Sequence, residues 1–294
     1  MAASAALTCL ASIALASPSY VFTTISDPLG GLYTVASGIN DSGQIVGAYT
    51  DAAGHLNGFA DSGGVFTTID FPSASFSSAT GINNLGEIVG FYPGQGGTPS
   101  GFLYNGGTFT TLSDPLALGT FAQGINDAGQ IVGNYTDSSG NSHGFVYYNG
   151  TFTTIDDPLG VGTSGNSANG INDAGQIVGT YTDSGGVSHG FLYNNGTFAT
   201  IGANAAGINN AGQIVGSGFL YAGGVFTAIS DPAGKNGGPY GINNSGQVVG
   251  IYADSGGTHG YLATPTPEPS ALALAFAALT LIGFPHLLKR LTRS

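Results

Sequence analysis

The chain has 294 residues, including 52 glycines and 13 prolines, and 16 acidic residues against 4 basic ones give it a net charge of −12. A surface this acidic repels phosphate backbones, so we expect no nucleic acid partner. The only cysteine, Cys9, lies in the first apolar stretch, and a lone cysteine excludes a disulfide framework and thiolate metal sites within the chain.

Residues 1–16 predict a secretory signal peptide. An apolar run from Ala5 to Ala16 ends in Ala14-Leu15-Ala16, which has the small-x-small pattern of a cleavage site. No Lys or Arg precedes the run, which departs from the usual signal pattern, and a buried N-terminal helix is the alternative. The folded body is then expected over residues 17–264.

A ten-residue block recurs six times along this body. GINDAGQIVG begins at Gly124 and again, unchanged, at Gly170, and close copies begin at Gly38, Gly81, Gly207 and Gly241. Successive blocks are 43, 43, 46, 37 and 34 residues apart. Periods of this length indicate stacked or radially arranged repeat units.

One unit, residues 124–156, shows what each repeat is expected to form. Asn126 to Gly129 and Asp137 to Gly140 have turn composition, and Asn149-Gly150 favours a two-residue hairpin because both residues tolerate positive φ. Between the turns we expect four antiparallel strands at 124–125, 130–135, 144–148 and 152–155. Apolar residues occur on both faces of these strands, which is typical of a sheet between two neighbours, and four short strands per repeat predict a β-propeller blade.

Six of these blocks predict six blades, and the ends of the body predict how the ring closes. The strand Phe22–Ile25 precedes the first block, whereas the last block has no such strand after it. We therefore expect Phe22–Ile25 to pair with Gly260–Ala263, which leaves no free sheet edge. Blade five is the irregular one, because GQIVGSGFLY is shorter between its middle strands than the other units. The expected fold class is all-β, a six-bladed propeller of four-stranded antiparallel blades closed by the N-terminal strand.

Residues 265–294 predict a membrane-anchoring tail. The 18 residues from Ala271 to Leu288 carry no formal charge, and a helix of that length spans about 27 Å, close to the thickness of a bilayer core. The cations Lys289, Arg290 and Arg293 follow directly, as expected for a cytoplasmic anchor. We therefore expect a C-terminal transmembrane helix over residues 271–288.

The triplet Pro267-Glu268-Pro269, the apolar helix and the basic end occur in the order of the PEP-CTERM sorting signal, which residues 267–294 closely resemble. The basic end is less dense in arginine than is usual for that signal. The resemblance implies a tail read by an exosortase-type processing enzyme in the membrane, after which the body is released or passed to the cell surface, often beside exopolysaccharide production. Similar tails are also labelled as part of ice-binding proteins, which implies no activity for the body.

The body resembles the HAF repeat, a family of probable extracellular repeats named for an HAF or HGF triplet. Two units lack the histidine and have Ser100-Gly101-Phe102 and Ser217-Gly218-Phe219, and in the first unit His55 stands three residues ahead of Gly58. The resemblance implies export and repetition but no particular chemistry. The matching triplets are His143-Gly144-Phe145, His189-Gly190-Phe191 and His259-Gly260-Tyr261.

The histidines and the loop aspartates are the candidate metal ligands of the chain. Radial repetition would place equivalent histidines one blade apart, far beyond ligand distances of about 2 Å, so we expect structural histidines. Loops of the form Asp-x-x-Gly could bind Ca²⁺, but turn formation explains each of them. We expect no cofactor, with calcium as the alternative. The candidates are His55, His143, His189 and His259, and the loops at Asp51, Asp137, Asp183 and Asp254.

A catalytic set needs residues that are not copies of one another, and nearly every polar residue here is a repeat copy. We therefore expect a non-catalytic protein. A glycosidase with paired carboxylates is an alternative, because Asp156-Asp157 and the loop aspartates are available. Threonine pairs suit edge strands, although they also suggest a flat ice-binding array. These pairs are Thr67-Thr68, Thr110-Thr111 and Thr153-Thr154.

Together these features predict an exported, non-catalytic cell-surface or matrix protein that is sorted through its C-terminal tail. Its expected partners are the membrane, through the C-terminal helix, an exosortase-type enzyme and exopolysaccharide. The alternative is a propeller that binds or hydrolyses carbohydrate, and a more distant one is an ice-binding or adhesion protein.

Overall fold

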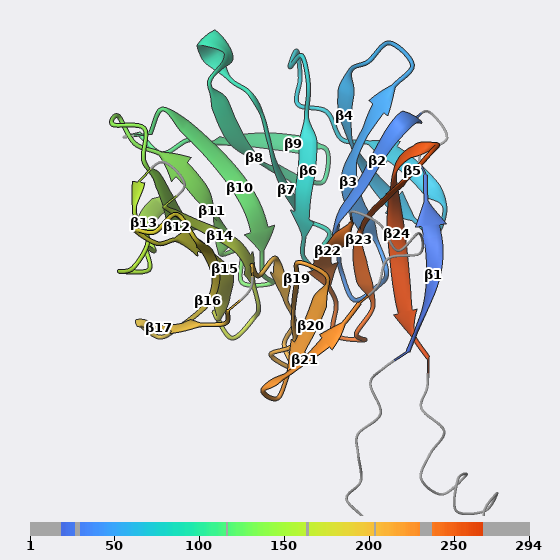
Figure 1. Ribbon diagram of the computed structural model, residues 1–294. Helices are drawn as coiled ribbons and strands as arrows, with labels where there is room; N and C mark the ends of the chain where they lie inside the picture. Colours follow the sequence, from blue (N-terminus) through green and yellow to red (C-terminus); the bar gives the residue numbers. More distant parts are fainter. Residues whose placement is uncertain are drawn as a thin grey trace, which may run out of the picture. The chain divides into compact units, whose positions relative to one another are not determined.

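The computed structural model describes residues 19–26, 30–115, 117–162, 165–202, 204–229 and 237–266 (Figure 1). The signal peptide 1–16 and the helix 271–288 lie outside these ranges and stay predictions. Within the described ranges, no helix has the length and apolar character needed to cross a bilayer. The remaining sorting residues, Pro267, Glu268, Pro269, Lys289, Arg290 and Arg293, also lie outside the described residues.

The chain divides into two compact units, of which Phe22–Thr264 carries the repeats. The other unit combines Met1–Val21 with Pro265–Ser294. In its described part, the Thr266 N–H donates a hydrogen bond to the Ser19 carbonyl at 2.8 Å.

The repeat unit is all-β and consists of six sets of four antiparallel strands (Figure 1). A single parallel bridge between Tyr33 and Thr258 joins blade six to blade one. A short 3₁₀ turn, Gln95–Gly97, lies between two strands of blade two. Blade one contains β2 (Gly30–Ile39), β3 (Ile45–Asp51), β4 (Leu56–Ser62) and β5 (Val65–Thr68), and blade two contains β6 (Ser78–Ile82), β7 (Ile88–Pro93), β8 (Pro99–Asn105) and β9 (Thr108–Leu112). Blade three contains β10 (Gly119–Ile125), β11 (Ile131–Thr136), β12 (Ser142–Tyr148) and β13 (Thr151–Thr154), and blade four contains β14 (Asn166–Ile171), β15 (Ile177–Thr182), β16 (Ser188–Asn194) and β17 (Thr197–Thr200). Blade five contains β18 (Gly207–Ile208), β19 (Ile214–Gly216), β20 (Phe219–Ala222) and β21 (Val225–Ala228), and blade six contains β22 (Gly238–Ile242), β23 (Val248–Asp254), β24 (Gly257–Pro265) and β1 (Tyr20–Ile25).

The turns and outer strands of each blade agree with the sequence prediction, but the innermost strand does not. In blade three the predicted strand at 124–125 is too short, because β10 begins at Gly119, which pairs with Thr136 at the far end of β11. The residues that extend β10 have no counterpart in the repeated block, so their pairing could not be read from the repetition.

The six units form a closed ring, as hydrogen bonds between neighbouring blades show. In blade three the buried Asn126 side-chain amide donates to the Asn172 carbonyl of blade four at 3.1 Å. Each blade repeats this bond with the next, and the amide of Asn243 in blade six donates to the Asn40 carbonyl of blade one at 3.1 Å. The chain of bonds therefore returns to its start after six blades. The bonds between them are Asn40 to Asn83, Asn83 to Asn126, Asn172 to Asn209 and Asn209 to Asn243.

The ends of the body close blade six, as the sequence predicts. β1 pairs with β24, and the rings of Phe22 and Tyr261 pack edge-to-face with centroids 5.4 Å apart. Thr24 hydrogen-bonds the Tyr252 hydroxyl at 2.8 Å, and the same threonine–tyrosine bond joins Thr154 to Tyr135 within blade three. β1 therefore occupies the outer-strand position of a regular blade.

Each blade buries its apolar residues against the next blade around the ring. Val132 of blade three packs with Ile171 and Phe191 of blade four, and Val249 of blade six packs with Phe59 of blade one. These valines are fully buried. Because no blade can bury both of its faces alone, closure of the ring completes the core.

Glycines fix how closely the strands of one blade approach. A Cβ at Gly133 would lie 1.9 Å from the Phe121 carbonyl oxygen and 2.9 Å from the Phe145 ring. A Cβ at Gly124 would lie 3.2 Å from the Asn169 carbonyl oxygen of the next blade. The glycines of the repeated block are thus needed both within a blade and between blades.

Blade five keeps four strands but is reduced where the sequence is short. β18 has 2 residues and β19 has 3, whereas the equivalent strands of blade three have 7 and 6. The loop between β19 and β20 is replaced by a tight turn in which Ser217 and Gly218 both have positive φ. This reduction lies at the end of the ring opposite the Asn-x-x-Gly turns.

A candidate binding site on the propeller axis

The two ends of the propeller axis differ. At the end formed by the Asn-x-x-Gly turns, the polar groups of neighbouring blades hydrogen-bond to one another. The Asp127 N–H donates to the Asp173 carboxylate at 2.9 Å, and the Asn244 N–H donates to the Asp41 carboxylate at 2.8 Å. The same bond links every blade to the next, so these side chains form a second closed ring that fastens the blades together. Its members are Asp41, Asn84, Asp127, Asp173, Asn210 and Asn244.

At the other end of the axis, β-bulges direct single side chains inward. In blade three the pairing shifts between Ala122 and Gly124, so Gln123 is the extra residue of a bulge on the innermost strand. Blades one, two, four and six have the same shift at Ser37, Thr80, Asn169 and Tyr240. Bulges re-aim side chains and are common beside functional sites.

The bulge position differs from blade to blade although the residues beside it repeat. The residue before it is a fully buried alanine in blades one to four, and the residue after it is glycine in every blade. The position itself, by contrast, carries a different side chain in each blade. Around the ring the six residues are Ser37, Thr80, Gln123, Asn169, Ala206 and Tyr240.

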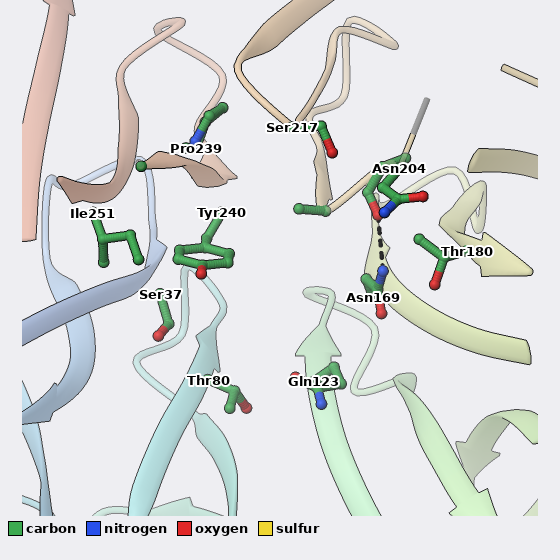
Figure 2. Close-up of a pocket in the computed structure, with 14 residues that line it drawn as sticks. Ser37, Thr80, Gln123, Asn169, Thr180, Asn204, Ser217, Pro239, Tyr240 and Ile251 are labelled. Atoms are coloured by element: carbon green, nitrogen blue, oxygen red, sulfur yellow. Dashed lines mark hydrogen bonds between the residues drawn. The ribbon is translucent and has the colours of Figure 1, made fainter. Parts of the chain in front are cut away.

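These six residues line a cavity of about 650 Å³. The cavity extends from the axis over blades four to six, where Thr180, Asn204 and Ser217 contribute to its wall, and Figure 2 shows these side chains around a shared space. The sequence prediction missed this site completely. The available signal was the one residue before each GIN triplet that varies while its surroundings repeat.

Bulky aromatic side chains fill the space on one side of the cavity. Phe91 follows the glycine of IVG in blade two and packs edge-to-face on Phe121 with centroids 5.1 Å apart, and Phe76 adjoins Phe91 at 6.3 Å. The residues at the positions of Phe91 and Phe121 in blade five are Ser217 and Asn204. The small residues and short strands of blade five therefore leave open the space that aromatic rings occupy in blades two and three.

The described residues of the lining are a mixture of polar and apolar side chains without a charge. Two of its side chains fasten neighbouring blades: Asn169 donates to the Ala205 carbonyl at 2.8 Å and Thr80 donates to the Ala122 carbonyl at 2.8 Å. The Asn169 bond is the one drawn in Figure 2, and Gln123, Asn204 and Ser217 add further polar side chains to the lining. None of the fourteen lining residues is Asp, Glu, Lys, Arg or His.

Tyr240 supplies an aromatic face at the cavity. Its side chain is 42% exposed, and burial of the remainder, followed by the nearby Tyr33, raises the pKa of its hydroxyl. The phenol is therefore neutral at physiological pH and can donate a hydrogen bond while its ring stays available for stacking.

The candidate histidines are spread over different blades and pair with aspartates. His143 contacts Asp156 through Nδ1 at 2.6 Å and Asp137 through Nε2 at 3.3 Å, and its ring stacks on Tyr135. Burial lowers the pKa of His143, but hydrogen bonds to Asp156 and Asp137 outweigh it and raise the pKa above its usual value. Within the described residues no three metal-ligating side chains gather to hold an ion. The other pairs are His55 with Asp51, His189 with Asp183 and His259 with Asp254.

The loop aspartates hold their own turns. Asp137 accepts hydrogen bonds from the backbone N–H groups of Ser139 and Asn141 at 2.8 Å each. The bond from the Asn141 N–H, with those from the Asn141 and His143 side chains, lowers the pKa of Asp137 to about 2. Turn formation accounts for these carboxylates, as it does at Asp51, Asp183 and Asp254.

The carboxylates considered for glycoside hydrolysis lie outside the cavity lining. Asp156 binds His143 and the Gly144 N–H, and Asp157 is 3% exposed and accepts from the Leu159 N–H. The threonine pairs lie on the outer strands of three different blades, where Thr111 and Thr154 bind tyrosine hydroxyls. They therefore do not form one continuous flat array.

Comparison with known proteins supports the fold class. No family model matches the chain, and no curated protein matches it. A mutant of the Aleuria aurantia lectin in complex with Fucα1-6GlcNAc superposes with a TM-score of 0.51 at 14% identity, covering 83% of this chain and 100% of the lectin chain. A second structure of that lectin, described as a six-bladed β-propeller with a novel fucose recognition mode, has a TM-score of 0.50 at 13% identity and covers 81% and 96% of the two chains.

A third similar structure is TolB from Acinetobacter baumannii, with a TM-score of 0.50 at 12% identity over 80% of this chain and 55% of TolB. At such identities the similarity shows the fold alone. The protein is thus an all-β, six-bladed propeller built from four-stranded antiparallel sheets.

Proposed function

We propose that this protein is a non-catalytic, carbohydrate-binding propeller that holds a sugar in the axial cavity. The observation that supports this most is the set of differing, uncharged and mostly polar side chains at the bulge position, directly before a glycine that repeats in every blade. Repetition explains side chains that build the ring, but it does not explain a position that differs in every blade.

The chemistry of the lining fits a ligand with many hydroxyl groups. The amides of Gln123 and Asn204 can each donate and accept hydrogen bonds, and Ser217 can do both through one hydroxyl. Tyr240 offers an apolar face with a polar tip, which suits the C–H face of a sugar ring. Few polar groups converging in a concave site are typical of small-molecule binding, and the similar lectin structures show that a six-bladed propeller can support sugar binding.

Binding is favoured over hydrolysis because the described residues of the lining include no acid. A glycosidase generally places two carboxyl groups about 5 to 9.5 Å apart across the scissile bond. No Asp or Glu stands among the described residues that line the cavity, so these residues can orient a sugar but supply no carboxyl pair to cleave it.

A glycan array probed with the full-length chain tests this proposal. We expect binding to neutral glycans, and about a tenfold or greater loss with Tyr240→Ala, because a stacking aromatic ring contributes on the order of 1 to 3 kcal/mol. Tyr148→Ala is the matched control, since Tyr148 is 44% exposed on a hairpin of blade three outside the cavity lining. Failure of the wild-type chain to bind any glycan would refute the proposal, as would equal losses in the two variants.

We also propose that the protein is exported and sorted through its C-terminal tail. The support is the sequence of residues 1–16 and of residues 267–294. The mass of the protein recovered from cells would show both termini, and deletion of Ala271–Ser294 should move the protein into the medium. An intact mass, or an unchanged membrane fraction after the deletion, would contradict this proposal.

A further inference from the structure

The axial cavity has an inner end near the axis and an open side, and the two differ. Near the axis, the glycines that follow the bulge residues bring neighbouring strands together, because a Cβ at Gly81 would lie 2.8 Å from the Gln123 carbonyl oxygen and 3.1 Å from Gly124. The space along the axis at this level is about 90 Å³, against about 650 Å³ in the cavity above it. A sugar chain therefore has no room to continue along the axis.

The open side of the cavity lies over blade five. Asn204 is exposed at the entry to this blade, and Ser217 forms the tight turn that replaces the longer loop of other blades. Thr180 of blade four and Ile251 of blade six flank this side. On the opposite side, Phe91 and Phe121 pack against each other in the equivalent space.

We propose that the cavity binds the terminal unit of a neutral oligosaccharide at the axis, between Tyr240 and Gln123, and that the following units leave over blade five past Asn204 and Ser217. This inference rests on the proposed carbohydrate-binding function and adds which part of a glycan is recognised and in which direction the chain runs. One propeller then binds one glycan end, because the axial position is shared by all six blades.

We expect a neutral ligand because the described residues of the lining carry no charge. A carboxylate beside them would lose water without gaining a cationic partner from this part of the chain. The excess of acids over bases in the chain adds a repulsive field. An acidic glycan end is therefore disfavoured twice.

Calorimetric titration of the full-length chain tests the proposal. The probes are methyl glycosides of fucose, galactose, glucose and mannose, their linear oligomers of two to four units, and the same oligomers with a hexuronate as the terminal unit. We expect the affinity for the best neutral series to rise at least tenfold between one and three units, and to fall at least tenfold when the terminal unit is the hexuronate. Equal affinity for the neutral and acidic ends would overturn the assignment of a neutral ligand.

Two tryptophan variants test the direction of the chain. Asn204→Trp fills the open side, so we expect it to abolish the gain from the second and third units while the affinity for the monosaccharide changes less than twofold. Ser138→Trp, at an exposed loop position on blade three, is the matched control and should leave both affinities unchanged. Gln123→Ala should weaken every member of the series by a similar factor, because it acts on the terminal unit.

The outcomes separate the two proposals. If the wild-type chain binds neutral sugars but Asn204→Trp weakens mono- and oligosaccharides equally, the exit over blade five is wrong and sugar binding stands. If affinity does not change with Gln123→Ala, the axial position of the terminal unit is wrong. If no neutral probe binds, both proposals are refuted.

Discussion

The two ends of the propeller axis are built from adjacent residues of the same repeat, yet they differ in what they can do. At the turn end, Asn126 and its equivalents are identical in all six blades and are 3% exposed, and their side chains bind the next blade. At the cavity end, three residues earlier in the chain, Gln123 and its equivalents all differ and face open space. The comparison teaches that the repeated asparagines bind the next blade all round the ring, whereas the bulge residues line the cavity with different side chains, of which Thr80 and Asn169 also bind the next blade.

The largest effect is expected where a repeated glycine is changed. Gly133→Ala places a Cβ 1.9 Å from a carbonyl oxygen and against the Phe145 ring, and overpacking of this kind costs about 3 kcal/mol or more. Gly129→Ala, at a turn glycine with φ of 76° and open space around it, should cost only about 1 kcal/mol. Urea denaturation of both variants measures the difference, and similar midpoints would contradict the close-packing argument.

The second prediction contrasts the two ends directly. Asn126→Ala removes three hydrogen bonds, to the Asn172 carbonyl and to the side chain and N–H of Gln130, and leaves buried groups unpaired at a cost of about 2 to 3 kcal/mol. Gln123→Ala should change the free energy of unfolding by less than about 0.5 kcal/mol, since Gln123 is only partly buried and lines the cavity.

Thermal unfolding and sugar titration of the same two variants sharpen this contrast. Asn126→Ala should unfold at a lower temperature and bind sugar normally. Gln123→Ala should unfold at the wild-type temperature and bind sugar more weakly. A binding defect in Asn126→Ala at a temperature where it is folded would show that the ends are not independent.

A smaller effect tests how the ring closes. Tyr252→Phe removes the bond to Thr24, which joins the two ends of the body, and Tyr135→Phe removes the equivalent bond to Thr154 inside blade three. Each lost hydrogen bond should cost about 0.5 to 1.5 kcal/mol. Equal destabilisation in denaturant would indicate that β1 is held as firmly as an outer strand joined by a hairpin.

The smallest effect concerns pH. Because hydrogen bonds to Asp156 and Asp137 raise the folded-state pKa of His143, its stabilising contribution is fully present below the unfolded value of about 6.5 and is lost as pH rises through the folded pKa. The stability difference between wild type and His143→Gln should therefore shrink between pH 6 and pH 8. His189→Gln is the matched control, because His189 contacts one aspartate and His143 contacts two. A stability difference between wild type and His143→Gln that grows with pH would contradict the assignment.

Much of the ring could be predicted from the sequence because its signals are local. Asn149 and Gly150 have φ of 48° and 82°, as a two-residue hairpin turn requires. Because the units repeat, the same prediction applies to the other blades. The pairing of Phe22–Ile25 with β24 followed from an unmatched strand at each end.

The cavity could not be predicted in the same way. Whether Gln123 faces the axis depends on the bulge between Ala122 and Gly124, and a shift of one residue in a strand reverses the face to which a side chain belongs. The open side over blade five arises because the loop between β19 and β20 is short. A short loop in the sequence does not by itself indicate a binding surface.

The direction of the last strand sets how the cavity is presented. β24 runs toward the Asn-x-x-Gly turns, since Ala263 pairs with Val248 directly after the final turn. The described end of β24 therefore lies at the turn end of the ring, opposite the cavity that Tyr240 lines. A surface attached at the turns would leave that cavity open to a ligand.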